Sequence, residues 1–115
     1  MSKRDDDILL GDVIESIDHI NDYTKDISLE IFLKDQKTKD AVARNFEIMG
    51  EAVARMNKEF KITYAHIDWK DLKEFRNIII HAYEIVDYSL VWDTIKNELP
   101  PLYKQVKDLL NSLIK

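Results

Sequence analysis

The sequence contains no cysteine, only two glycines and only two prolines. Without cysteine, the chain has no disulfide, no thiolate ligand for a metal and no cysteine nucleophile. Sandwiches, barrels and dinucleotide-binding folds need turn residues and glycine-rich loops, so the scarcity of glycine and proline argues against them. No apolar run approaches the roughly 20 residues that a membrane-spanning helix needs. The fold class that remains is a compact all-α bundle.

The size and composition are those of one folded domain, which we expect to span residues 1–115. Hydrophobic residues make up 45% of the chain and charged residues 34%, a balance that excludes a disordered chain. The start of the chain turns acidic at Asp5, where a signal peptide would continue with an apolar stretch. We therefore expect a cytoplasmic protein with no membrane association.

The charge is unevenly distributed along the sequence. The net charge is −5, yet residues 1–30 alone hold three basic and nine acidic residues. The remaining residues are nearly neutral, so the total charge neither supports nor excludes an RNA substrate, although it argues against non-specific coating of long nucleic acids. Lys34, Lys37 and Lys39 form a small basic cluster that is solvated by default, with RNA backbone contact as the alternative.

The apolar spacing predicts an up-and-down bundle of about five helices. The first helix covers about residues 5–21, and a short helix over 28–33 begins with Ser28 as its N-cap. A long helix then begins at Asp35 or Thr38. Its apolar stripe follows a heptad-like spacing and consists of Val42, Phe46, Met49, Val53, Met56 and Phe60.

The second half of the chain is predicted to contain a linker and two further helices. The linker covers about residues 57–67, and Asp68 follows it as an N-cap. Asp87 is predicted to cap the last helical segment, residues 88–115. Pro100 and Pro101 lie within that segment, where they are expected to kink or restart the helix.

Gly50 lies in the middle of the predicted long helix. A glycine in a helix interior costs about 1 kcal/mol relative to alanine. Close approach of another backbone would compensate for this cost. The partner is either another helix of the bundle or a second subunit across a dimer interface.

The segment from Arg76 to Tyr83 places four polar side chains in the most apolar predicted helix. At about 100° per residue, Asn77 and His81 share one face, and Arg76 and Tyr83 share another. Arg76 and His81 are about 140° apart around the helix. They converge only if the arginine reaches around the helix, if the helix end unwinds, or if a second subunit completes the site.

An arginine and a histidine beside a cleft suit RNA cleavage without a metal ion. Histidine titrates near neutrality, so it can take the proton of a ribose 2′-hydroxyl or give one to the leaving oxygen. A guanidinium holds a phosphate through two hydrogen bonds and stabilises the charge of the transition state. The sequence thus makes Arg76 and His81 candidate catalytic residues.

Structural roles for the same residues stay open at this point. His81 can be an interior histidine and Tyr83 a core aromatic residue. Arg76 can pair with a nearby carboxylate, for which the candidates are Glu47, Glu51 and Glu74. The three histidines lie on separate segments without a zinc-ligand spacing, so no metal or other cofactor is expected.

The segment Arg76 to Tyr83 has the form R-x4-H-x-Y, and with it the chain resembles the HepT-like toxins of the HEPN superfamily. Residues 44–52 (RNFEIMGEA) are similar to a second segment of that family, and residues 67–69, 91–92 and 99–100 match further positions in order. Two departures stand out. Asp68 replaces the usual proline, and Glu74 with Phe75 replaces a common Gly-Met pair, which puts an extra acid beside Arg76.

The resemblance implies more than the spacing does. HepT-like proteins are helical homodimers in which two R-x4-H-x-Y motifs face a shared cleft, and they act as metal-independent endoribonucleases on cellular RNA such as tRNA or mRNA. Their partner is a MntA-type nucleotidyltransferase antitoxin, which transfers AMP from ATP onto the motif tyrosine. By position, Arg76 and His81 would be catalytic, Asn77 supporting, and Tyr83 the modified residue.

Two other functions remain possible from the sequence. The protein can be a non-catalytic helical module that binds nucleotide or substrate for a minimal nucleotidyltransferase. It can also be a dimeric scaffold whose site is degenerate.

Overall fold

The computed structural model describes the backbone of residues 3–80 and 86–114 and the side chains of residues 5–77 and 86–114. The all-α class is confirmed, since these ranges contain helices and no strand. None of the helices described is long and apolar enough to cross a membrane. The elements in order are α1 (Lys3–Thr24), α2 (Leu29–Lys34), α3 (Gln36–Arg55), α4 (Lys58–Thr63), α5 (Trp69–Ile80), α6 (Tyr88–Asp93), the π-helical η1 (Thr94–Glu98) and α7 (Leu99–Leu113).

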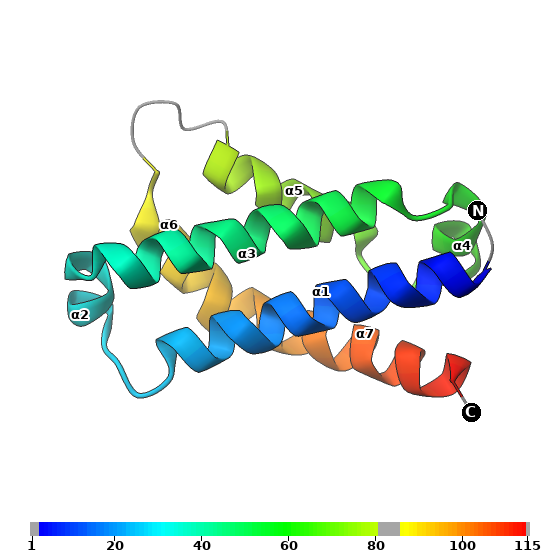
Figure 1. The fold of residues 1–115 in the computed structure, drawn as a ribbon, viewed down its shortest axis with the longest axis horizontal. Helices are drawn as coiled ribbons and strands as arrows, with labels where there is room; N and C mark the ends of the chain where they lie inside the picture. The colour runs from blue at the N-terminus through cyan, green and yellow to red at the C-terminus, as the bar shows by residue number, and fades with distance from the viewer. Residues whose placement is uncertain (1–2, 81–85, 115) are drawn as a thin grey trace.

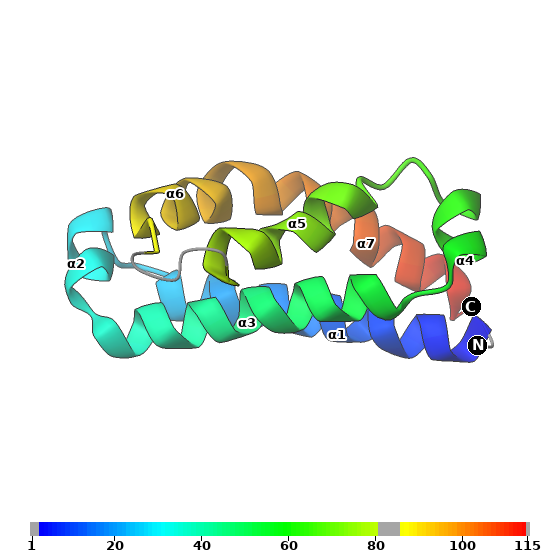
Figure 2. The ribbon, with the colours of Figure 1, turned by 90° about the horizontal axis from the view of Figure 1, so that it is seen from above.

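The four longest helices run alternately up and down the bundle (Figure 1). Helices α1 and α3 lie side by side in opposite directions, α5 packs on α3, and α7 packs on α1. Seen from above, α5 lies beside α3, while the short helices α2 and α4 lie at opposite ends of the molecule (Figure 2). This topology agrees with the predicted bundle.

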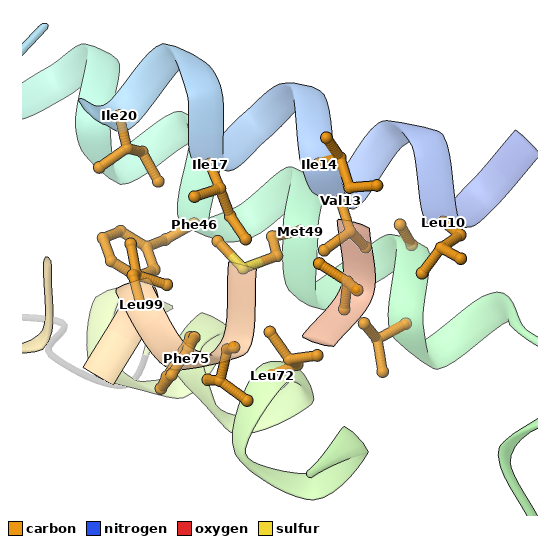
Figure 3. Close-up of a cluster of buried hydrophobic side chains, with 14 of the residues drawn as sticks. Leu10, Val13, Ile14, Ile17, Ile20, Phe46, Met49, Leu72, Phe75 and Leu99 are labelled. Carbon is orange, nitrogen blue, oxygen red and sulfur yellow. The ribbon is translucent and has the colours of Figure 1, made fainter. Parts of the chain in front are cut away.

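The core lies between these four helices (Figure 3). Side chains from α1, α3, α5 and α7 point toward one another there, and Phe46 meets Phe75 edge-on at 5.8 Å between ring centroids. Every residue of the apolar stripe predicted for the long helix is buried, but α3 ends at Arg55, so Met56 follows the helix and Phe60 belongs to α4. Full burial of one valine, leucine, isoleucine, phenylalanine or methionine side chain stabilises the fold by about 1.5–3 kcal/mol. The residues labelled in the figure are Leu10, Val13, Ile14, Ile17, Ile20, Phe46, Met49, Leu72, Phe75 and Leu99.

The three predicted N-caps Ser28, Asp68 and Asp87 are present in the structure, and of the two starts predicted for the long helix Asp35 is the N-cap. The side chains of Ser28, Asp35, Asp68 and Asp87 each accept a backbone N–H two or three residues later, at 3.0–3.2 Å. The hydroxyl and backbone N–H of Thr38 also lower the pKa of Asp35 by hydrogen-bonding its carboxylate. These caps satisfy orphan donors at the helix starts.

The predicted linker over residues 57–67 contains helix α4, so that part of the prediction is wrong. The helix has six residues and a single buried side chain, Phe60, which leaves no periodicity to detect. Asn57 precedes it and donates its backbone N–H and its Nδ2 to the carboxylate of the buried Asp6, at 3.0 and 3.1 Å. Contacts distant in sequence therefore fix the start of α4.

The paired prolines interrupt the last helical segment as predicted, and the interruption is a π-helical turn. The N–H of Leu99 donates to the carbonyl of Thr94, five residues back. Pro100 and Pro101 supply no N–H, and they occupy the first positions of α7, where an N–H has no partner within the helix. The helix thus continues past both prolines with a local change of hydrogen bonding.

Candidate active site

The predicted site begins at the last turns of α5. Arg76 is half-buried there, and Asn77 is exposed. Two of the four candidate residues are thus placed on this helix, one residue apart. His81 and Tyr83 lie outside the described residues, so their place in the site remains a prediction.

Gly50 allows the backbone of α5 to approach α3 at the level of Arg76. A Cβ atom built on Gly50 would lie 2.5 Å from the Arg76 Cβ, 3.2 Å from the Lys73 carbonyl oxygen and 3.4 Å from the Arg76 Cα. All three neighbours belong to the backbone of α5 or to the first side-chain atom, so they cannot swing aside. The predicted close approach is therefore confirmed, and its partner is a helix of the same bundle.

Two of the three carboxylates predicted as alternative partners of Arg76, Glu47 and Glu51, pair with another cation, and the third, Glu74, forms no ion pair among the described residues. Arg44 holds both Glu47 and Glu51 on α3, with N···O distances of 3.9 and 3.8 Å. Within residues 5–77 and 86–114, no carboxylate forms an ion pair with Arg76. Arg76 thus packs against α3 at its Cα and Cβ, and its guanidinium forms no ion pair with a described acid.

A small pocket of about 300 Å³ lies beside Arg76. It is lined by Lys70, Lys73, Glu74, Arg76 and Asn77, all from α5. Three cations and one carboxylate face this pocket, so it favours an anion such as a phosphate. Glu74 is the extra acid noted in the sequence, and it reduces the positive charge there.

Lys70 and Lys73 are additions that the sequence analysis did not single out. They precede Arg76 at intervals of three residues, which places them along one side of the helix. This three-residue spacing is the feature of the sequence from which the two lysines could have been predicted as part of the site. It was obscured by the acids Asp71 and Glu74, which alternate with the lysines and make the segment nearly neutral as a whole.

Two larger hollows of the described surface have acidic residues in their linings and are less favourable for RNA. One of about 550 Å³ is lined by three aspartates, Asp18, Asp22 and Asp26, and two lysines, so its net charge is negative and disfavours a phosphate. Another of about 630 Å³ lies between α1 and α4, at the hydrogen-bonded pair of Asp6 and Asn57. Charge, not size, therefore favours the pocket beside Arg76.

The two histidines that the structure describes, His19 and His66, lie on different segments. His19 on α1 hydrogen-bonds through Nδ1 to the Asn45 side chain at 3.3 Å and stacks on Tyr23. His66 is exposed between α4 and α5. Among the side chains described, no group of three histidine, aspartate or glutamate residues is arranged to hold a metal ion.

The model of the family described as "Ribonuclease HepT-like" matches residues 13–109. The chain belongs to the HepT-like ribonuclease family. The matched range contains Gly50, Arg76, His81 and Tyr83, so every candidate residue falls within the part that the HepT-like ribonucleases share.

Individual relatives agree with this assignment. A Thermococcus cleftensis protein named "Probable ribonuclease HepT" is 39% identical over 100 residues, which cover 87% of this chain and 91% of the relative. A Methanocaldococcus jannaschii protein named "Putative RNase" is 37% identical over 107 residues, which cover 93% and 98%. No solved structure matches the chain significantly. As a HepT-like ribonuclease, the protein is an endoribonuclease by family.

Proposed function

We propose that the protein is the toxic component of a HepT/MntA-type toxin–antitoxin system and cleaves RNA without a metal ion, through Arg76 and His81. The observation that supports this most is the state of Arg76. The Cα and Cβ of Arg76 pack against Gly50. No described carboxylate forms an ion pair with its guanidinium, and Lys70 and Lys73 line the same pocket. A guanidinium in such surroundings is prepared to hold a phosphate.

The proposed reaction needs one base, one acid and one cation. The imidazole of His81 removes the proton of a ribose 2′-hydroxyl, and the 2′-oxygen attacks the adjacent phosphorus. The bond from phosphorus to the 5′-oxygen breaks, and an acid returns a proton to that oxygen. The products are a 2′,3′-cyclic phosphate and a 5′-hydroxyl. Arg76 stabilises the added negative charge of the pentacoordinate transition state.

A homodimer fits this chemistry. Arg76 and His81 are five residues apart, which does not place them on one face of a continuous helix. Two copies of the motif facing one cleft would supply a guanidinium from one chain and an imidazole from the other. The second imidazole would also be available for the opposite proton transfer.

The test is cleavage of a defined RNA by the purified protein in excess EDTA. We expect cleavage products with cyclic phosphate and 5′-hydroxyl ends, and a fall of about 100-fold or more in rate for His81→Ala. The alternative of a non-catalytic binding module predicts that the protein binds AMP or ATP and leaves the RNA intact. Cleavage by a folded His81→Ala at the wild-type rate would refute the assigned role.

The proposed partner is a MntA-type nucleotidyltransferase that transfers AMP onto Tyr83. The adenylate would place bulk and a phosphate charge near the motif, seven residues from Arg76 in sequence. Such a tethered anion competes with the substrate phosphate for the guanidinium, and the attraction is strong at short range. The modified protein would therefore lose RNA cleavage.

Tyr83→Phe is expected to remain active and to escape modification, because it lacks the acceptor hydroxyl. Intact mass should show an adenylate on the wild type after incubation with the nucleotidyltransferase and ATP, and none on the variant. Cells that express both proteins should then survive with the wild type and arrest with the variant. Full neutralisation of Tyr83→Phe by enzymatic modification would exclude Tyr83 as the acceptor.

A further inference from the structure

Two depressions adjoin on the surface formed by α4, α5 and the segment between them. The pocket beside Arg76 contains Lys70, and so does a second depression of about 510 Å³ that extends to α4. The second depression adds Lys58 and Lys61 from α4. We call the row of basic side chains along both depressions the basic track: Lys58, Lys61, Lys70 and Lys73, with Arg76 at its end.

The basic track is a local excess of positive charge on an acidic protein. The linings of the two depressions hold five basic residues and two acids, Asp68 and Glu74, in a chain of net charge −5. One of the acids, Asp68, also caps α5 by accepting the N–H of Asp71, and the five basic residues still outnumber the two acids. The acidity of the chain is concentrated instead in residues 1–30.

Two cations of the track, Lys61 and Lys73, are close enough to repel one another. Lys61 is half-buried, and its ammonium donates to the carbonyl of Val53 at the end of α3, at 3.2 Å. Burial lowers the pKa of Lys61 first, and the nearby charge of Lys73 lowers it further, while Asp6 opposes the shift. A bound phosphate would relieve this repulsion, and no described acid near Lys73 forms an ion pair with it.

The spacing along α5 suits a strand that follows the helix. Lys70, Lys73 and Arg76 recur every three residues, so they cover roughly 9 Å of helix length at about 1.5 Å per residue. Lys70 and Lys73 are exposed, whereas Arg76 is half-buried. The lysines can thus meet a polyanion at the surface, and Arg76, the more buried residue, is the last of the row.

We propose that the basic track binds the ribose-phosphate backbone of the RNA substrate and guides it to Arg76. This inference rests on the proposed function, since it names the surface through which the ribonuclease holds its substrate. Lysines bind phosphates as point charges without reading the base sequence. The track therefore contributes affinity and position, and it leaves the choice of cleavage site to the motif and its surroundings.

The basic cluster noted in the sequence, Lys34, Lys37 and Lys39, is a poorer candidate for this role. Lys34 lies 3.7 Å from the carboxylate of Glu30. Lys39 donates to the carbonyl of Leu33 at 2.9 Å, and its ammonium lies over the Tyr88 ring at 5.1 Å. This cluster lies near α2, at the end of the molecule away from α4, and it offers a matched control.

The test compares two double variants that remove the same charge, Lys70→Ala/Lys73→Ala and Lys34→Ala/Lys37→Ala. All four lysines are exposed, so both variants should fold. For the first, we expect binding of a single-stranded oligoribonucleotide carrying an uncleavable 2′-O-methyl ribose to weaken about tenfold, and the slope of log K against log salt to fall by about 1.4. KM for cleavage should rise with little change in kcat, because the lysines hold substrate and transition state alike.

Three results would overturn the inference. Unchanged affinity and salt slope in Lys70→Ala/Lys73→Ala, with normal RNA cleavage by the wild type, would refute the track and leave the ribonuclease intact. An equal loss of RNA affinity in both double variants would show that the affinity depends on the total charge of the protein and not on the basic track. A changed oligomeric state with unchanged RNA affinity would identify the surface as a protein interface. If the wild type neither binds nor cleaves RNA, the proposed function itself fails.

Discussion

Replacement of Arg76 by alanine is expected to lower the rate of RNA cleavage by about 100-fold or more and to leave the fold intact. The rate falls because the variant loses the guanidinium that would hold the phosphate in the transition state. The fold persists because alanine keeps the Cβ that packs against Gly50, and no described carboxylate loses an ion-pair partner. Single-turnover cleavage and thermal unfolding measure the two quantities separately.

Two further variants separate the role of the guanidinium from that of charge. Arg76→Lys keeps the positive charge but lacks the planar fork, so we expect a loss smaller than that of Arg76→Ala, about tenfold. Arg55 lies exposed in the last turn of α3 and provides the matched control, and Arg55→Ala should cleave like the wild type. A folded Arg76→Ala that cleaves at the wild-type rate would remove Arg76 from the mechanism.

The boundaries of the helices were predictable where the signal is local. Ser28, Asp35, Asp68 and Asp87 each cap a helix within three residues of themselves, so a short stretch of sequence contains the whole interaction. The interruption of the last helical segment at Pro100 and Pro101 could be predicted from the sequence in the same way. Its π-helical form could not, because the sequence shows which N–H groups are missing but not which carbonyl the Leu99 N–H will choose.

Helix α4 escaped prediction because tertiary contacts define it. Phe60 is its one buried residue, and Asn57 before it is held by Asp6, more than 50 positions earlier in the chain. The same limit applies to the basic track. Lys61 and Lys73 are twelve residues apart and belong to different helices, so their proximity follows only from the fold.

The candidate site was only partly readable from its motif. The types of its residues indicated the chemistry, and the spacing placed Arg76 and Asn77 on one helix, as the structure has them. From the sequence, either another helix or a second subunit could approach Gly50. A glycine indicates that a backbone comes close, but its sequence position does not identify that backbone. The structure adds that the approaching backbone is that of Arg76 itself.

This contact makes Gly50→Ala the most informative change outside the motif. A Cβ on Gly50 would lie 2.5 Å from the Arg76 Cβ, so α5 has to move away from α3. The displacement should cost about 3 kcal/mol, against about 1 kcal/mol gained in helix propensity. We therefore expect the free energy of unfolding to fall by about 2 kcal/mol. Cleavage by the folded variant should fall about tenfold or more, because Arg76 moves with the helix.

Gly11 provides the matched control, since it also lies inside a long helix but has nothing within 4 Å of an added Cβ. Gly11→Ala should raise the free energy of unfolding by about 1 kcal/mol and leave cleavage unchanged. Urea unfolding at one temperature compares the two variants directly. If the free energy of unfolding falls for Gly50→Ala and rises for Gly11→Ala, the loss of stability at Gly50 is due to the close approach of α5. Equal stabilisation with normal cleavage would mean that α3 does not position Arg76.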